Sequence, residues 1–497
     1  MSNVKTTVCA CALMNTNTFP AMTQDIIIRS EAGKPMVEAD NEAIRQMQAL
    51  AQKATKSAGG ERQRIHLILR NQQLADILKR TPLSEALAEQ VELYAYTEQD
   101  LWSMAMLGVQ PGSTTRLDRL PITADSPQHV HLVIFGMSAQ AESLAIHTAL
   151  IAHYPNYCHD HALRTRITLV SDAQDDFLNF QQRYHNLLVH SYRRSVLTTD
   201  DDISCDTLSP KYQGQRDDFV DIEWEFVNGR SHDNNLLHKL QLWAQDEMQQ
   251  LTLAFCYPDD QRNLCETLSL SPLHDTPIWV RTRDDTVLQL VKQSGLHPGL
   301  TAFGMTNATL PDMRRFIRMA QCISYAYRRM RETSDEEQAR GLSPIAIATE
   351  IPTAADLSAV WNERSIPTQK LWSNIYHAFT LTTKMHSLGH ADDEWQTLFA
   401  ISEREVESLA EVEHNRWSVE ELILGYRPTT DDEHRRILQN ISLRGTLKQQ
   451  LAHDDLRSYR ELGCDETDRN VARYDVALIR TLPLIAHTFY EVETHTP

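Results

Sequence analysis

The sequence predicts an α/β protein in which a doubly wound parallel Rossmann-like sheet fills the N-terminal and central region and an all-α C-terminal part follows. Short apolar runs between residues 131 and 304 alternate with helical patterns, which is typical of a doubly wound parallel sheet. After Gly304 the strand patterns stop, and apolar residues recur at helical spacing only. We therefore expect one sheet domain followed by helices.

The central strands are predicted from apolar runs bounded by polar turns. They cover residues 131–136, 166–171, 221–226, 251–257, 277–281 and 300–304. Between the second and third runs lies a polar, partly acidic insertion, residues 176–218, which predicts a solvated loop.

Two further apolar runs, residues 65–69 and 91–96, each lead into a helical pattern and predict a βαβα unit near the N-terminus. Residues 108–128 are rich in Pro, Thr, Asp and Ser and predict a linker or long loop. Whether the N-terminal region is an incomplete Rossmann-like half stays open. The predicted domains are 1–125 (α/β), 126–310 (Rossmann), 311–395 (helical connector) and 396–490 (helical domain).

Composition excludes several classes of protein. The 497-residue chain has 48 Lys and Arg against 67 Asp and Glu, a formal charge of -19, which argues against broad nucleic-acid binding. No stretch of about 18 apolar residues predicts a membrane span. The eight cysteines show no repeated paired spacing, which favours a reduced, cytoplasmic protein.

One cluster, Cys158-His159-Asp160-His161, contains residue types that bind zinc. Adjacent positions on a loop seldom converge on one ion, and no second motif nearby completes a tetrahedral site. We therefore expect no metal.

The turn after the run at 131–136 places small residues at Gly136, Ser138 and Ala141, followed by Glu142, in the pattern of a dinucleotide-binding turn. The next run is followed by Asp172, where an acid accepts hydrogen bonds from a ribose. Ser138 replaces the glycine that normally lets a phosphate approach. A nucleotide site and a Rossmann-shaped sheet that binds nothing both remain open.

This region, about residues 130–305, resembles the TrkA-N domain of potassium-conductance regulators through GMSAQAESL, LTLAFCYPDDQRNLCETL and PIWVRTRDD. The resemblance implies NAD or an adenine nucleotide as cofactor, bound at Gly136, Ser138 and Asp172. It also implies a homodimer, because units of this kind usually pair.

The second candidate site lies in AEVEHNRWSVEELILGYRP, where Glu413, His414, Arg416 and Trp417 fall within about one helical turn. Ser402 is expected to cap this helix, with Glu405 as its capping-box partner. In one interpretation Trp417 anchors a helical core. In the other, an aromatic face and His and Arg donors form a pocket for a base or a phosphate.

Residues 398–488 resemble the ryanodine-receptor (RyR) domain, which implies that ligand contacts come from His414, Arg416, Trp417, His453, Tyr459 and Arg469. The segment 371–390, with Asn374, Lys384 and Gly389, is similar to the helix that precedes this domain in bacterial Rossmann-RyR fusions. The family usually has His-Pro where this chain has His453-Asp454, so the loop contacts can differ.

Three function classes follow from these patterns. The resemblances imply a soluble sensor or regulatory protein for a nucleotide or nucleotide-derived signal, in bacterial signalling or antiviral defence. A second class is a cytoplasmic regulator that docks on a potassium channel or another effector through an apolar patch, for example on residues 313–330. A third is a nucleotide-processing enzyme with Glu413 and His414 as acid and base, although no nucleophile with a base accompanies them.

Overall fold

The computed structural model describes most of the chain. The described residues are 25–53, 62–81, 88, 90–109, 113–198, 203–208, 219–270, 273, 276–295, 299–305, 311–340, 352–362, 368–390, 400–462 and 472–487. The chain forms two compact units, of which the first comprises Met1–Leu101 with Thr353–Trp372 and the second Trp102–Pro352 with Ser373–Pro497.

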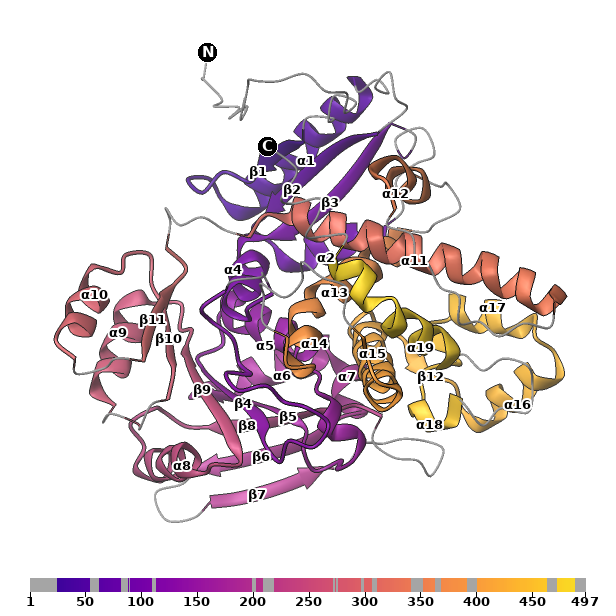
Figure 1. Ribbon diagram of the computed structural model, residues 1–497. Coiled ribbons are helices and arrows are strands. Elements are labelled where there is room, and N and C mark those ends of the chain that lie inside the picture. Colours follow the sequence, from indigo (N-terminus) through magenta and orange to yellow (C-terminus); the bar gives the residue numbers. More distant parts are fainter. Residues whose placement is uncertain are drawn as a thin grey trace. The chain divides into compact units, whose positions relative to one another are not determined.

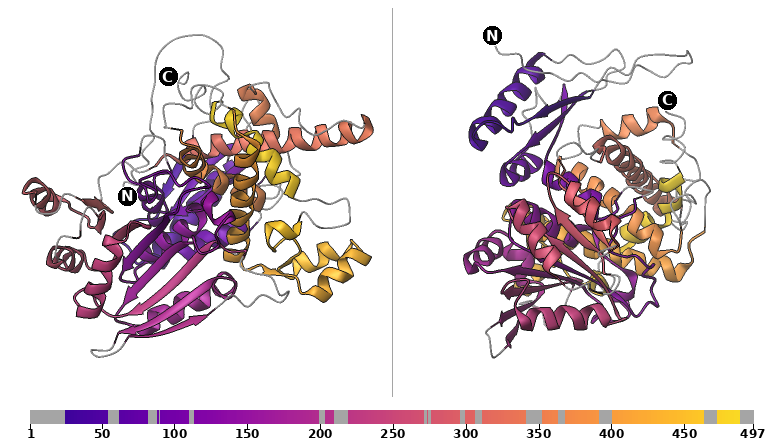
Figure 2. Two further views of the ribbon diagram at one scale, coloured as in Figure 1. Left: turned by 60° about the horizontal axis from the view of Figure 1, so that its bottom comes forward. Right: turned by 90° about the vertical axis from the view of Figure 1, so that its left-hand side faces the viewer.

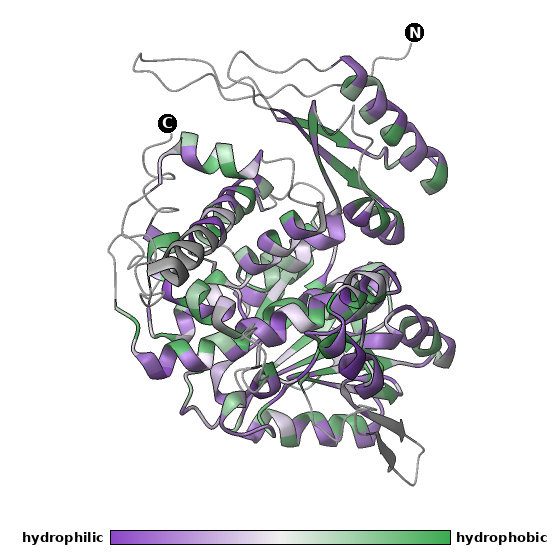
Figure 3. Cartoon of the chain, turned by 90° about the vertical axis from the view of Figure 1, so that its right-hand side faces the viewer, coloured by the Kyte–Doolittle hydropathy of each residue, from purple (hydrophilic) through white to green (hydrophobic). Residues whose placement is uncertain are grey.

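The first unit contains a three-stranded parallel sheet in the order β1 (Ile26–Arg29), β2 (Gln63–Leu69), β3 (Val91–Thr97). The two predicted strands are confirmed as β2 and β3, and β1 was not predicted. Helix α1 (Met36–Lys53) buries Ala39, Ala43, Met47 and Ala51, which lie four residues apart, and its two sides differ in hydropathy (Figure 3). Helix α2 (Gln72–Arg80) lies between β2 and β3 in the chain.

The chain returns to this unit at α12 (Ala354–Trp361). Trp361 is buried, and its Nε1 donates a hydrogen bond to Tyr94 Oη at 3.1 Å. Arg62 of β2's entry donates to Trp361 O at 3.3 Å and to Asn362 Oδ1 at 3.1 Å. The returning segment is therefore part of the N-terminal unit rather than a free connector.

The second unit is built on an eight-stranded sheet with the order β11-β10-β9-β4-β5-β8-β6-β7 (Figures 1 and 2). All of its described strand pairs are parallel except β6 with β7. The six predicted strands are confirmed as β4 (His129–Phe135), β5 (Thr165–Ser171), β8 (Ile222–Asn228), β9 (Gln249–Phe255), β10 (Ile278–Arg281) and β11 (Leu300–Phe303). The predicted doubly wound parallel sheet is thus present.

The prediction of a solvated loop over 176–218 is wrong. This segment contains α6 (Gln174–Arg183), α7 (His185–Val189) and the antiparallel strands β6 (Tyr192–Thr198) and β7 (Ile203–Leu208), and β6 joins the sheet beside β8. An edge strand has a neighbour on one side only, so its sequence can stay polar.

The helices of the sheet follow the strands in alternation. They are α5 (Ala139–Ile151), the 3₁₀ turn η1 (Pro155–Cys158), α8 (Asn234–Gln245), α9 (Asp260–Ser269) and α10 (Thr286–Gln293). Helix α5 is buried along almost its whole length, because the sheet covers one side and α15 (Glu403–Ile423) packs on it as well. Phe135 and Phe255 stack in the core below, with ring centres 4.5 Å apart.

The predicted loop 108–128 contains no described helix or strand but is packed into the second unit. Leu117 and Ile122 are buried. Asp118 is also buried and accepts from Arg116 at 3.0 Å and lies 2.8 Å from His386 Nδ1.

The C-terminal part is mostly helical. Its helices are α11 (Met313–Arg340), α13 (Thr368–Phe379), α14 (Leu381–Ser387), α15, α16 (Asp431–Gln439), α17 (Leu443–Gln449), α18 (Tyr459–Leu462) and α19 (Ala472–Arg480). The all-α prediction holds only in part, because β12 (Arg427–Pro428) and β13 (Ala452–His453) form a short parallel pair. None of the described helices is both long enough and apolar enough to cross a membrane.

Helix ends follow the sequence signals closely. The predicted capping box at Ser402 is confirmed, because its side chain accepts from Glu405 N while Glu405 accepts from Ser402 N. The predicted helix over 371–390 is instead two helices that separate at Thr380. It ends as expected at Gly389, which has φ +78°.

Candidate functional site

The strand order of the second unit reverses between β4 and β9. From β4 the chain proceeds to β5 and β8 on one side, and it returns to β9, β10 and β11 on the other. Open α/β sheets bind ligands beyond the carboxyl ends of the strands at such a switch point, since the loops on either side diverge there. The turn that carries Gly136 and Ser138 follows β4 directly.

Gly136 adopts a left-handed conformation, with φ +84°. A Cβ atom at this position would lie 2.6 Å from Tyr257 Cδ1, because the Tyr257 ring packs against the turn. Glycine is therefore required here by conformation and by packing alone.

Ser138 caps helix α5, and its hydroxyl accepts from Ala141 N at 3.3 Å. Ala141 is fully buried. Glu142, in the first turn of α5, accepts from Arg183 and from Tyr184 Oη, the latter at 2.9 Å. The predicted turn residues thus lie together at the start of one helix, with an arginine beside them.

Asp172 follows β5, and its Oδ2 accepts from Arg230 Nε at 3.0 Å and lies 3.4 Å from an Arg262 guanidinium nitrogen. The Arg262 guanidinium stacks over the Tyr257 ring at 3.7 Å from the ring centre. The structure therefore joins the Gly136 turn to Asp172 through Tyr257 and Arg262, two residues for which the sequence gave no role. Their position directly after a predicted strand was the signal that could have found them.

The second candidate site is different in kind, because Glu413 lies at the centre of a buried ionic network. Lys384 Nζ lies 2.7 Å from its Oε2, and His377 Nδ1 lies 2.7 Å from its Oε1. Arg416 donates to Glu413 at 2.9 Å and to Glu420 at 2.7 Å. The side chains of all five residues are at most 2% exposed.

Electrostatics in this network favour internal pairing. Burial alone would raise the pKa of Glu413, but Arg416, His377 and Lys384 outweigh it and hold that pKa well below its ordinary value. Burial lowers the pKa of Lys384, which Glu413 partly offsets. Burial lowers the pKa of His377 to about 4, so this imidazole is neutral at pH 7. Such groups stabilise one another and are not presented to a substrate.

An aromatic cluster lies on the other side of α15. His414 and Trp417 have ring centres 5.7 Å apart, Trp417 meets His453 edge to face at 4.9 Å, and Tyr459 lies 5.8 Å from His414. His414 Nε2 donates to Arg457 O at 2.7 Å, and burial lowers the pKa of this histidine to about 4. Trp417 is only half-buried, so it is not the fully buried core anchor that one interpretation expected.

The residues predicted as RyR-type ligand contacts therefore separate into three groups. Lys384 and Arg416 belong to the buried network, and Asn374 is buried on α13. His414, Trp417, His453 and Tyr459 form the aromatic cluster. Arg469 lies outside the described residues.

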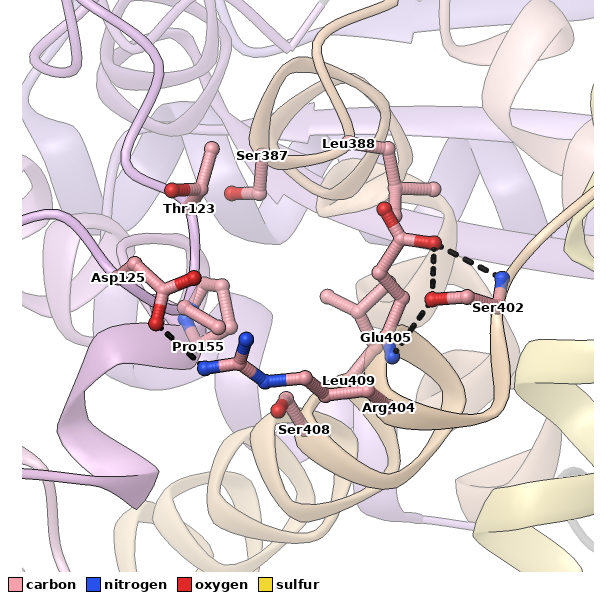
Figure 4. A pocket seen from close by; sticks show the side chains of 11 residues that line it. Thr123, Asp125, Pro155, Ser387, Leu388, Ser402, Arg404, Glu405, Ser408 and Leu409 are labelled. Carbon is pink, nitrogen blue, oxygen red and sulfur yellow. Dashed lines mark hydrogen bonds and ion pairs between the residues drawn. The ribbon is translucent and has the colours of Figure 1, made fainter.

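Two cavities lie against α15. The larger one, here called the α15 cavity, has a volume of about 590 Å³, and Tyr459 is the one predicted ligand residue on its wall. The smaller one, of about 220 Å³, adjoins it at Arg404 and Ser408. Figure 4 shows the smaller cavity, with Arg404 reaching from α15 to Asp125.

No group of three or more His, Cys, Asp or Glu side chains in the described part of the chain is placed to hold a metal ion. Cys158 is buried and donates weakly to Ser408 O at 3.4 Å, whereas His161 stacks on Tyr157. Comparison of the chain with family models, with curated proteins and with solved structures gives no match.

Proposed function

We propose that this protein is a regulatory ligand-binding protein that takes a nucleotide at the switch point of its parallel sheet. The observation that carries the proposal is the reversal of strand order beside the Gly136 turn, with the N-terminus of α5 and Asp172 at the same edge. A helix N-terminus favours a phosphate, and an acid after the second strand of such a sheet accepts ribose hydroxyls.

Local charge supports the same proposal. Although the chain carries a formal charge of -19, Arg183, Arg230 and Arg262 gather at this edge through Glu142 and Asp172. The arginine side chains are 34–56% exposed, so they are accessible to a phosphate. Guanidinium groups bind phosphate oxygens in pairs, which suits an anionic ligand.

The proposal is tested with NAD, NADH, ADP and ATP, by calorimetry and thermal shift on the full chain. Asp172→Asn should weaken nucleotide binding by about tenfold, because one charged hydrogen-bond acceptor is lost. Glu247→Gln is the matched control, since Glu247 is exposed just before β9, at the opposite edge of the sheet. The proposal fails if none of the four nucleotides binds at millimolar concentration, or if both variants bind equally well.

The wider assignment remains part of the proposal. The resemblance to TrkA-N and RyR domains supports a cytoplasmic homodimer that senses a nucleotide-derived signal, in bacterial signalling or antiviral defence. Sedimentation with and without nucleotide tests the dimer.

The two alternative functions receive less support from the geometry. Glu413 and His414 are both 2% exposed, and neither lines a cavity described above, which disfavours them as an acid and base pair. In the described part of α11 the large apolar side chains face inward, so this helix does not offer the apolar docking patch that a channel regulator would need.

A further inference from the structure

The α15 cavity has walls from three places in the second unit. Helix α15 forms one wall with Arg404, Glu407 and Glu411, α18 supplies Tyr459 and Arg460, and η1 closes it near Cys158. Its volume of about 590 Å³ falls within the range of small-molecule sites, roughly 300–1,000 Å³. It is separate from the switch point, whose residues do not line it.

Both signs of charge line this cavity. Arg404, Glu407 and Glu411 lie three and four residues apart and share one face of α15. Arg460 stands opposite, and one of its guanidinium nitrogens donates to Cys158 O at 3.1 Å. Two arginines and two glutamates give a formal charge of zero, so a polyanion gains little here.

The two carboxylates are poorly compensated within the chain. Like charges four residues apart on a helix repel each other, and within the described residues Glu407 makes no ion pair. Burial raises the pKa of Glu411, which Arg460 only partly offsets. A cation placed between these carboxylates would relieve both effects, and the Tyr459 ring on the same cavity offers it a π face.

The anionic end of a ligand has a partner in Arg404. This side chain is paired with Asp125, but the two side chains are 61% and 72% exposed, and exposed pairs contribute little stability. Arg404 can therefore exchange Asp125 for a carboxylate in the cavity at low cost. Seven residues separate Arg404 from Glu411, about 10 Å along a helix.

We infer that the α15 cavity binds a zwitterion of the basic amino acid or short-peptide class, with its cationic end between Glu407 and Glu411 and its carboxylate on Arg404. The separation of the charges favours a ligand whose ammonium or guanidinium group lies several bonds from its carboxylate. Because the walls come from α15, α18 and η1, the bound ligand connects the C-terminal helices to the sheet.

The experiment is calorimetry on the full chain with L-arginine, L-lysine and glycyl-lysine as probes. Spermidine carries only the cationic end, succinate only the anionic end, and GMP represents a nucleotide. At least one zwitterion should bind about tenfold or more tightly than each of the other three, because both ends are recognised. The inference is overturned if no zwitterion binds at millimolar concentration or if a single-sign probe or GMP binds as tightly.

Variants separate binding from folding. Glu411→Gln and Arg404→Gln should each weaken the bound zwitterion by about 10- to 100-fold. The Glu411→Gln protein without ligand should keep or raise its Tm, since a buried charge is removed. Asp432→Asn and Arg435→Gln, an exposed pair on α16, are the matched controls. Unchanged affinity in Glu411→Gln would overturn the assignment even if nucleotide binding at the switch point is found.

Discussion

At the scale of single residues, side-chain types alone did not decide what the segment around Glu413 does. An acid, a histidine, an arginine and a tryptophan within one helical turn suit either a pocket or a core. The partners decide it, since Lys384 lies 29 positions earlier in the chain and on another helix. Glu413 and Arg416 turned inward to those partners, whereas Trp417 remained half-exposed beside His453.

We predict that Glu413→Gln strongly destabilises the second unit. The substitution leaves Lys384 and Arg416 buried beside an uncharged amide, and breaking a buried pair in this way costs about 3–5 kcal/mol. Urea unfolding followed by tryptophan fluorescence measures the loss. Arg435→Gln, which removes an exposed ion pair, should change the free energy of unfolding by less than about 1 kcal/mol.

A small loss in Glu413→Gln, similar to that of the control, would mean that the network is not held together by this carboxylate. Loss of a ligand response without loss of stability would instead revive a catalytic or binding role for Glu413. The two results are distinguished by measuring stability and nucleotide binding on the same preparation.

At the scale of elements, hydrophobic patterning predicted what is buried on both faces. The six central strands are continuous apolar runs, because parallel strands inside a sheet are covered on both sides. The edge pair β6 and β7 was missed because its sequence is polar, and β12 with β13 because two-residue strands carry no periodic signal.

The candidate site was predictable to the same extent. The turn from Gly136 to Glu142 has a local sequence signature, and the structure places it at the start of α5. The arginines on Asp172 come from 58 and 90 positions away, so only the fold could bring them together. Cavities depend on how helices pack, and no local pattern in α15 announces one.

We predict that Gly136→Ala destabilises the protein by about 2 kcal/mol or more. A methyl group would meet the Tyr257 ring at 2.6 Å, and the left-handed backbone disfavours any side chain. Gly445→Ala is the matched control, because nothing lies within 4 Å of its added Cβ and alanine favours the helix. Thermal unfolding of both variants measures the difference.

Adding Tyr257→Ala to Gly136→Ala separates the two causes. Removal of the ring relieves the steric contact but leaves the backbone strain, so stability should recover only in part relative to Tyr257→Ala alone. Full recovery would show that the left-handed conformation contributes nothing, and no recovery would show that the Tyr257 contact is not the obstacle.

At the scale of the whole molecule, the chain passes through two compact units, and the first is discontinuous in sequence. Residues 353–372 read as part of a helical connector, because a short amphipathic helix gives no sign of what it packs against. In the structure Trp361 is one of the largest fully buried side chains and contacts Tyr94 of β3. Completion of the N-terminal unit therefore depends on a segment about 260 residues later in the chain.

We predict that Trp361→Ala destabilises the first unit selectively. Replacing a buried tryptophan by alanine costs about 3–5 kcal/mol, and here it also removes the hydrogen bond to Tyr94 Oη. Hydrogen exchange should show faster exchange in β2 and β3 while β4, β5 and β9 keep their protection. Trp224→Ala, in the buried strand β8, is the reciprocal test and should release β4 and β5 but spare β2 and β3. Equal loss of protection in both sheets for either variant would mean that the two units unfold as one, because a local defect would then reach both.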